Sequence, residues 1–504
     1  MSAGKASLTR TGVRGAVVIA AAQVIKLGTQ TLSVVVLARL LTPADFGVVA
    51  SVAPVTGLVL LFQDFGLQQA IIQRRDITQA QLSPAFWFTV ALGCGCGALL
   101  ALLAPAVAAF YGDARLLSVT VATAPSLLLA SAGSVPMALL NRALRFRALA
   151  AVETVAAVTV FAVTVAASAA GARYWALVLG TLAGNTVLTG GAWYAAGWRP
   201  DRPRRQLPDS TMLRFGGNLV GFGLMNFAAR NLDNVLIGCF SGATALGYYD
   251  RAYKLLLFPL LNVNAPLARV AIPLLSRIES DKPRLRNAFL NITSQIGLLT
   301  IPGMAALVAT SRETVEILFG NGWQPVAPIF AWLGLAGFVQ PITWAVSWLL
   351  TAQGRTASLF RWGAYASTTA VLSFAVGLRW GPVGVAAAYA ISEYALRLPI
   401  LYWTVARVGP VTARDLFGLQ APLLAAASLT IVVSAEWLRA AGLSPAVLIA
   451  ATVSLSYALA AGLHALVPRN RAAMRETFSL RPVQAVLPAF RRVLAGTRTV
   501  LHRP

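Results

Sequence analysis

The sequence has few of the residues from which metal and redox centres are built. Of its 504 residues, 3 are cysteines and 2 are histidines, and they form no Cys/His cluster. Transition-metal sites are assembled from such clusters, so we expect neither a metal nor a cofactor. Cys94 and Cys96 lie two positions apart, on different faces of a helix, which predicts neither a disulfide nor a CxxC redox pair.

Charged side chains are also scarce, and acidic ones are the scarcest. Charged residues make up 12% of the chain, with 17 acidic against 41 basic residues and a net charge of +24. Hydrophobic residues make up 57% and the mean hydropathy is +0.70, far from the balance of a soluble globular protein. Such a charge would suggest nucleic-acid binding in a soluble protein. Here its distribution along the chain gives another explanation, so no nucleic-acid partner is expected.

Long apolar segments recur from one end of the chain to the other. A helix needs about 20 apolar residues to cross about 30 Å of hydrocarbon. We therefore predict an all-α, polytopic membrane protein of about fourteen transmembrane helices. The predicted spans are 15–38, 47–62, 84–109, 116–138, 148–170, 174–197, 214–240, 249–273, 288–310, 325–352, 357–378, 382–405, 414–437 and 444–467.

Lys and Arg gather in alternate connecting segments. The basic segments are the amino terminus, the tail, and the loops near residues 74, 145, 204, 282, 355 and 410. The opposite segments hold one basic residue each: Arg39, Arg115, Arg173, Arg251, Arg312, Arg379 and Arg439. By the positive-inside rule, both termini are expected in the cytoplasm. The tail either lies on anionic membrane lipids or is a disordered basic segment that fixes the orientation.

The chain repeats itself at a spacing of about 200 residues. TQTLSVVVLARLLTPADFG (29–47) aligns without a gap with ARNLDNVLIGCFSGATALG (229–247). AAFYGD around Gly112 resembles EILFGN around Gly320, and GARYWALV from Gly171 resembles GPVGVAAA from Gly381. We interpret the repeat as two pseudo-symmetric six-helix lobes, followed by two extra C-terminal helices.

This interpretation divides the chain into five parts. They are an N-terminal lobe (1–200), a basic cytoplasmic linker (201–213), a C-terminal lobe (214–405), two additional spans (406–467) and a basic cytoplasmic tail (468–504). Because six is even, both lobes would enter the membrane from the same side, as parallel repeats do. That arrangement is typical of transporters that bind substrate between the repeats and work by alternating access.

Polar side chains inside three predicted spans recur at helical spacing, so each set shares one face. The first span carries Gln23, Lys26, Gln30 and Ser33; the seventh carries Asn226, Arg230 and Asp233; the eighth carries Lys254, Asn262 and Arg269. The first and seventh spans are equivalent in the repeat, so we expect their polar faces to meet in a cavity with basic walls. Basic walls favour an anionic substrate, and phosphate or pyrophosphate suits Arg and Lys.

The individual roles of these residues stay open. Arg230 and Asp233 can neutralise each other and leave guanidinium donors for a ligand, or they can form a purely structural pair. Lys26 and Arg269 either line the cavity or extend to the membrane interface.

Two further carboxylates, Glu153 and Glu393, lie near or inside spans. They and Asp233 are the candidates for carrying a coupling ion. Export of an anion could also run without one, because moving one negative charge outward gains roughly 2.3 kcal/mol per 100 mV.

Several motifs together resemble the polysaccharide-exporting flippases of the multidrug, oligosaccharidyl-lipid and polysaccharide superfamily. They are LARLLTPADFGVVA (37–50), DFGLQQAIIQRRDIT (64–78), AAFYGD (108–113), VPMALLNRALRFRALA (135–150), GARYWALV (171–178) and RNLDNVLIGCFSGATALGYYDRAYKLLLFPL (230–260). The resemblance extends over residues 10–465.

The resemblance implies a two-lobed helical bundle in the bacterial inner membrane and no enzymatic activity. It also implies transfer of an oligosaccharide unit, linked by pyrophosphate to a polyprenyl lipid, from the cytoplasmic to the periplasmic leaflet. Its cationic ligands match Arg230, Lys26 and Lys254 best, with Arg39 a weaker match at the outer end of its helix. Other polysaccharide assembly proteins are possible partners. For the family's coupling acid, Asp233 is the one residue that matches.

Three alternatives remain at this point. A peptidoglycan lipid-precursor flippase would work by a similar mechanism. A multidrug or cation antiporter of the same superfamily usually carries carboxylates in its lobes, whereas the cavity expected here is basic. A membrane glycan polymerase would need a large periplasmic loop or a compact acid/base set, and no outward connection is long.

Overall fold

The computed structural model describes residues 3–63, 66–73, 77–202, 210–471 and 474. Within these residues all regular secondary structure is helical, as predicted. The chain divides into two compact units. The first unit comprises Met1–Arg251 with two short later segments, Leu318–Pro325 and Leu378–Pro382. The second unit comprises the rest of the chain.

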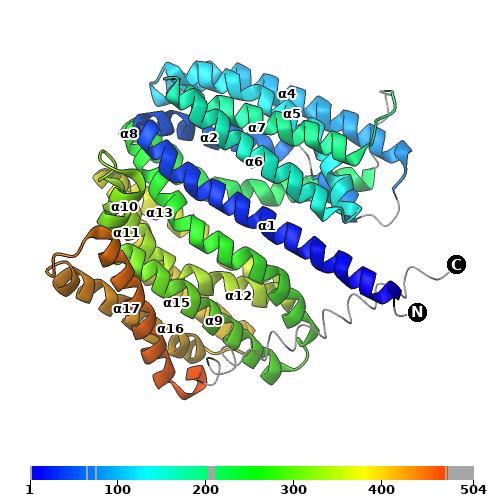
Figure 1. Ribbon diagram of the computed structural model, residues 1–504. Coiled ribbons are helices and arrows are strands. Elements are labelled where there is room, and N and C mark those ends of the chain that lie inside the picture. Colours follow the sequence, from blue (N-terminus) through cyan, green and yellow to red (C-terminus); the bar gives the residue numbers. More distant parts are fainter. Residues whose placement is uncertain (1–2, 64–65, 74–76, 203–209, 472–473, 475–504) are drawn as a thin grey trace. The chain divides into compact units, whose positions relative to one another are not determined.

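The first unit is built from seven helices and the first part of an eighth. They are α1 (Ala3–Leu40), α2 (Pro43–Gln63), α3 (Leu67–Gln73), α4 (Gln79–Tyr111), α5 (Arg115–Arg142), α6 (Phe146–Ala169), α7 (Trp175–Ala196) and α8 (Ser210–Arg277) up to Arg251. Helices α4, α5, α7 and α6 pack side by side, and α1 lies along α6 (Figure 1).

Apolar side chains hold these helices together. One buried cluster joins α3, α4 and α5 through Leu67, Ile71, Phe86 and Val135. The Phe86 ring meets the ring of Trp193 from α7 edge to face, with 5.4 Å between their centroids. Such ring pairs are favoured because the positive edge of one ring meets the negative face of the other.

The second unit contains the end of α8 and the later helices, apart from the two short segments that belong to the first unit. The later helices are α9 (Lys282–Ala309), α10 (Ser311–Phe319), α11 (Val326–Gly337), α12 (Gln340–Ala352), α13 (Thr356–Gly377), α14 (Gly381–Ser392), α15 (Leu398–Val408), α16 (Ala413–Val433) and α17 (Pro445–Leu466). A 3-10 turn (Leu378–Trp380) precedes α14, and π-helical turns follow α14 (Glu393–Arg397) and α16 (Ser434–Leu438).

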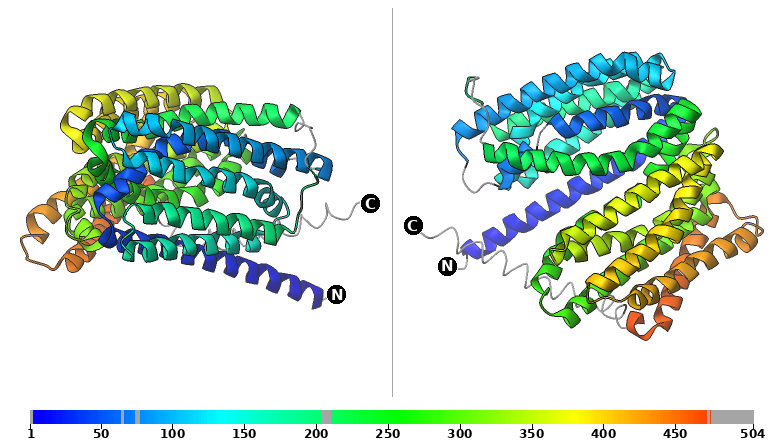
Figure 2. Two further views of the ribbon diagram at one scale, coloured as in Figure 1. Left: turned by 90° about the horizontal axis from the view of Figure 1, so that it is seen from above. Right: turned by 180° about the vertical axis from the view of Figure 1, so that it is seen from behind.

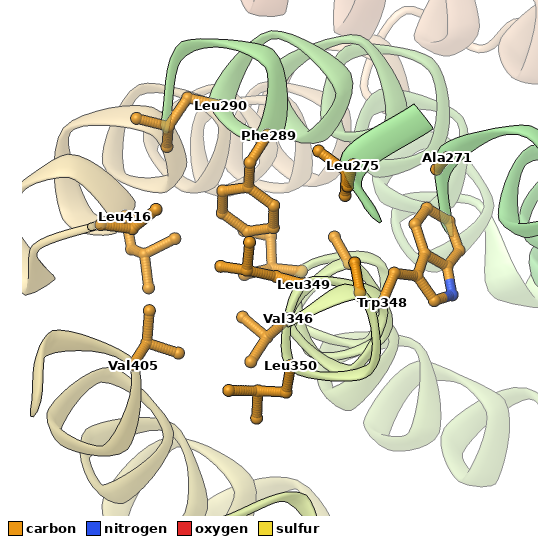
Figure 3. Close-up of a cluster of buried hydrophobic side chains, with 14 of the residues drawn as sticks. Ala271, Leu275, Phe289, Leu290, Val346, Trp348, Leu349, Leu350, Val405 and Leu416 are labelled. Atoms are coloured by element: carbon orange, nitrogen blue, oxygen red, sulfur yellow. The ribbon is translucent and has the colours of Figure 1, made fainter. Parts of the chain in front are cut away.

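The centre of the second unit is apolar. Helices α9, α16 and α17 pack against one another, and α12 and α11 lie against α9; Figure 2 shows these helices from two further sides. Figure 3 shows the main cluster, in which Phe289, Leu349 and Leu416 converge from α9, α12 and α16. All three side chains are buried, so this cluster fixes how the helices pack.

The described helices account for the predicted spans. Among the described residues, nine helical segments are long and apolar enough to cross a membrane, and one of them, Thr356–Arg407, holds two predicted spans. Helices α1 and α7 and the two arms of α8 match the remaining four. The described part of the chain is thus an all-helical polytopic membrane protein with about fourteen membrane-spanning helices.

The predicted division into lobes remains an interpretation. The first compact unit includes the seventh predicted span, which the repeat assigns to the second lobe. Residues 203–209 of the predicted linker, and all of the predicted tail beyond residue 474, lie outside the described residues.

The break in α8 falls where the repeat predicts it. Gly242 has φ +81°, a left-handed conformation that glycine adopts without strain, and it separates the two arms. The equivalent residue in the first copy, Thr42, precedes α2. Its backbone N–H and hydroxyl donate to the Asp45 carboxylate at 3.0 and 2.6 Å. The same turn is therefore made by a glycine with positive φ in the second copy and by hydrogen bonds between Thr42 and Asp45 in the first.

The two turns touch through their backbones, and two glycines permit it. A Cβ on Gly47 would lie 1.7 Å from the carbonyl oxygen of Ala243, and one on Gly247 would lie 1.9 Å from that of Pro43. The contact is reciprocal, because residues 43 and 47 of one copy meet residues 247 and 243 of the other. Equivalent residues that contact each other reciprocally are the mark of a local two-fold axis.

We expect Gly47→Val to destabilise the protein by at least about 1–3 kcal/mol, because a side chain cannot enter this contact without displacing backbone. The matched control is Gly28→Val, also within a helix, where an added Cβ meets no atom within 4 Å. Thermal unfolding of the purified variants in detergent measures the difference. Equal melting temperatures for the two variants would contradict the close contact.

Candidate functional site

Side chains of four segments reinforce the contact between the two turns. We call this cluster the repeat junction; it comprises residues 38–47, 110–113, 238–251 and 319–323. The Trp323 indole N–H donates to the carbonyl oxygen of Ala38 at 2.8 Å. The Trp323 ring packs edge to face against Phe46, and Tyr248 donates to the carbonyl oxygen of Gly322 at 3.2 Å. The guanidinium of Arg251 lies 4.1 Å from the centre of the Phe46 ring, a cation–π contact.

The junction follows the repeat in a second respect. Trp323, from the turn after α10, contacts Ala38. Tyr111, from the end of α4, lies against Gly238, the residue equivalent to Ala38, where an added Cβ would be 2.8 Å from its ring. Each copy thus places an aromatic ring on the helix end of the other copy, and separating the copies here would expose all of these rings.

Lys26 is the predicted cation whose surroundings the structure describes most fully. Its ammonium lies 3.0 Å from a carboxylate oxygen of Glu153, which links α1 to α6. The two side chains are 34% and 38% exposed. Lys26 lies well inside α1, away from both ends of the helix. Its charge is balanced by Glu153, and its head group is accessible.

Asp233 is buried and makes hydrogen bonds within α8. Its carboxylate accepts from the Tyr249 hydroxyl at 2.9 Å and from the backbone N–H of Asn234 at 2.8 Å. Tyr249 is also buried, so this bond connects the arms of α8 on either side of Gly242. The proposed partner Arg230 belongs to α8, but its side chain lies outside the described part of the chain.

Glu393 forms a buried ion pair in the second unit. The guanidinium of Arg397 lies 3.0 Å from its carboxylate, and the side chains are 7% and 4% exposed. Arg397 also donates to the carbonyl oxygen of Tyr389 at 2.6 Å and to the Ser392 hydroxyl at 2.9 Å, and its guanidinium lies over the Tyr389 ring. The pair spans a π-helical turn, a local widening often found at functional sites.

The other predicted site residues are placed as follows. Gln23, Gln30 and Arg39 are exposed on α1, and Lys254 and Asn262 are exposed on the second arm of α8. The Asn262 amide donates to the carbonyl oxygen of Phe258 at 2.7 Å. Asn226 and Arg269 lie in α8, and nothing of their side chains is described.

Sequence reasoning found the carboxylates in the spans but missed most of their partners. Arg397 follows Glu393 by four residues inside a span, and that spacing could have revealed the pair. Tyr249 and Trp323 carried no comparable signal, because their roles depend on contacts between distant segments.

We expect Arg397→Ala to lower the free energy of unfolding by about 3–5 kcal/mol, because it leaves the Glu393 charge buried without its partner. The control is Arg115→Ala, which removes a half-exposed partner of Asp113 at 2.7 Å and should cost at most about 1 kcal/mol. Hydrogen bonds from Arg115 lower the pKa of the Asp113 carboxyl, so this control pair is charged at neutral pH. Thermal unfolding in detergent checks both, and equal losses would contradict the buried pair.

The sequence is similar to a family of polysaccharide biosynthesis proteins. Residues 36–328, more than half of the chain, match the family described as polysaccharide biosynthesis protein. The lipopolysaccharide biosynthesis protein WzxC of Escherichia coli is 25% identical over 386 residues, 75% of this chain and 78% of the relative. The succinoglycan biosynthesis transport protein ExoT of Rhizobium meliloti is 24% identical over 411 residues, 81% of this chain and 82% of the relative.

Solved structures share the fold at low sequence identity. The lipid II flippase MurJ, in an inward closed conformation, superimposes with a TM-score of 0.71 at 12% identity, covering 90% of this chain and all of that one. A MATE-family multidrug resistance transporter of the MOP superfamily gives a TM-score of 0.60 at 13% identity, covering 76% of this chain and 94% of that one. The predicted resemblance is confirmed: the chain belongs to the polysaccharide biosynthesis protein family, as a multi-pass membrane protein.

Proposed function

We propose that this protein is a flippase for polyprenyl-pyrophosphate-linked oligosaccharide units. It moves them from the cytoplasmic to the periplasmic leaflet of the bacterial inner membrane, for lipopolysaccharide, capsule or exopolysaccharide synthesis. The family match over residues 36–328 carries the proposal. Relatives named for lipopolysaccharide biosynthesis and succinoglycan transport support it, as does a fold shared with a lipid II flippase.

Lys26 is the proposed ligand of the pyrophosphate for which the structure offers the most support. A pyrophosphate inside a membrane protein needs positive partners, and a lysine is a strong point charge for it. Lys26 has its head group accessible and a carboxylate, Glu153, 3.0 Å away. In this mechanism Glu153 neutralises Lys26 while the site is empty and is displaced when the pyrophosphate binds, so neither charge is left unpaired.

The same pair suggests which carboxylate responds to substrate. The Asp233 carboxylate accepts a hydrogen bond from Tyr249, and Glu393 forms an ion pair with Arg397. All four side chains are buried. Glu153 is the candidate whose partner is itself a proposed substrate ligand. A proton or cation taken up by Glu153 on displacement would couple transport to an ion, whereas outward movement of the anionic substrate alone is favoured by the membrane potential.

Alternating access requires a closure that can open, and the repeat junction is our candidate for it. The positive-inside pattern assigns its segments to the outward side of the membrane. It brings equivalent parts of the two repeat copies together through backbone and aromatic contacts. Opening toward the periplasm would separate these contacts as one step.

The remaining predicted ligands keep their proposed roles. Arg230 and Lys254 are proposed as further pyrophosphate ligands, with Arg39 and Arg269 as weaker ones. The amides Gln23, Gln30, Asn226 and Asn262 are proposed to bind polar groups of the substrate.

We expect Lys26→Ala to reduce polysaccharide export by roughly 10- to 100-fold, the loss that follows from one charge-assisted contact. Glu153→Gln should retain substrate binding, because Lys26 is then free of its competitor, but should export more slowly. Complementation of a deletion strain, with surface polysaccharide quantified and membrane levels of the protein matched, measures both.

The matched control is Lys282→Ala, which removes an exposed lysine at the start of α9, outside the proposed path. It should export like the wild type. Normal export by a Lys26→Ala protein would refute the role given to Lys26, while leaving the family assignment intact.

Both termini are proposed to lie in the cytoplasm, and this can be tested by labelling. In a background without native cysteines, a membrane-impermeant thiol reagent should label Asn321→Cys in spheroplasts and leave Ser280→Cys unlabelled. Both positions are exposed, in turns that the positive-inside pattern assigns to opposite sides. The reverse labelling pattern would invert the topology.

A further inference from the structure

A small cavity lies in the second unit, beside the first half of α9 and the first two turns of α16. Its volume is about 170 Å³, and the chain just after α17 completes its wall. Its lining combines Leu290, Leu419 and Val467 with the polar residues Asn291, Arg414 and Arg469. The proposed substrate path uses none of these residues.

The cavity carries more positive charge than its surroundings neutralise. Asp415 is the one carboxylate in its lining, and it is shared by two arginines: Arg286 bonds to both of its oxygens, and Arg469 lies 3.0 Å from one. The same carboxylate also accepts from the N–H and hydroxyl of Thr412 as the cap of α16. Its acceptor capacity is therefore used, and Arg414 adds a third guanidinium.

The electrostatics of Arg469 point the same way. Burial, and then the nearby charge of Arg286, lower the pKa of the Arg469 guanidinium from its ordinary value. The arginine stays charged at neutral pH. The contribution of Arg286 shows that the two guanidinium groups lie close enough to repel each other, and a bound anion would reduce that repulsion.

Hydrogen bonds hold the wall of the cavity in place. The buried His464 ring lies 2.7 Å from the Ser294 hydroxyl and 3.4 Å from the Asn470 amide. The Asn470 amide also lies 3.3 Å from the carbonyl oxygen of Gly418. The chain after α17 is thus tied to α9 and α16, and the arginine on it is held at a fixed place.

The shape of the cavity favours an amphiphile over a free ion. Its charged groups lie at the start of α16 and just after the end of α17, where membrane helices reach the level of lipid headgroups, and Leu290 and Leu419 contribute an apolar wall from α9 and α16. Gly418 keeps this wall open, because a Cβ there would meet no atom within 4 Å. Arginines that only fix the orientation of the protein in the membrane would require neither a cavity nor an apolar wall beside them.

We propose that this cavity binds the phosphate headgroup of an anionic phospholipid, with Arg414 and Arg469 on the phosphate and the glycerol end of the lipid against Leu290 and Leu419. Basic pockets between membrane helices on the cytoplasmic side are known to take such headgroups. The site does not depend on the proposed transport function.

The test measures lipid binding to the full-length protein in detergent by native mass spectrometry. The probes are phosphatidylglycerol, phosphatidylcholine and inorganic phosphate. Phosphatidylglycerol should bind the wild type more tightly than phosphatidylcholine does. Arg414→Gln should weaken phosphatidylglycerol binding about 5-fold, the order expected for one arginine beside an anionic lipid. Gly418→Leu should weaken it by filling the cavity, with no change in charge.

The matched control is Arg355→Gln, which removes an exposed arginine in the turn between α12 and α13, assigned to the same membrane side. It should bind phosphatidylglycerol like the wild type. Equal losses for Arg355→Gln and Arg414→Gln would mean that surface charge alone attracts the lipid, which overturns the proposal. Binding of inorganic phosphate that depends on Arg414, without a preference for phosphatidylglycerol, would overturn it as well, because the site would then serve a free anion.

Discussion

The arrangement of the first unit depends on one backbone contact, in which Gly47 and Gly247 let two helix starts meet closer than any side chain allows. The carbonyl oxygens of Ala243 and Pro43 occupy the places where the missing side chains would be. Because the residues are equivalent in the repeat, the contact brings the two copies together at matching points. This backbone contact cannot shift without moving the helices, so the aromatic rings of the repeat junction pack around a fixed point.

A second constraint is the cost of charge in a membrane. Every described carboxylate that we predicted inside a span has a partner: Glu153 has Lys26, Asp233 has Tyr249, and Glu393 has Arg397. The partners differ in accessibility, and our proposal rests on that difference. A pair that is fully buried and also hydrogen-bonded to backbone, as Arg397 is, stabilises a structure. A pair that is one-third exposed can exchange partners, which is what a transporter requires of a residue that binds and releases an anion.

The sequence was sufficient for the positions of the membrane spans, because apolar length is a direct consequence of the membrane. It also located the break at Gly242 and, through the repeat, aligned the two glycines that turned out to touch. It did not predict the short helices α3 and α10, the division of the span 325–352 into α11 and α12, or the start of α1 at Ala3. It could not identify what surrounds the polar residues. The bond from Tyr249 to Asp233 and that from Trp323 to Ala38 join segments whose proximity is a property of the folded chain. The four-residue spacing of Glu393 and Arg397 could have predicted their ion pair, but Glu393 was predicted as an ion carrier without a partner.

The family match makes this protein a membrane protein of polysaccharide biosynthesis, and our proposal adds that Lys26 binds the anionic part of a lipid-linked substrate. Because the fold is shared with a multidrug transporter as well as a lipid II flippase, the substrate must be decided by experiment. The most direct measurement is the extraction of polyprenyl-pyrophosphate-linked glycans from a strain that lacks the protein, with their membrane sidedness determined. The account predicts that a complete oligosaccharide repeat unit accumulates on the cytoplasmic leaflet. Absence of any such accumulation, together with increased sensitivity to drugs, would contradict it and favour an antiporter.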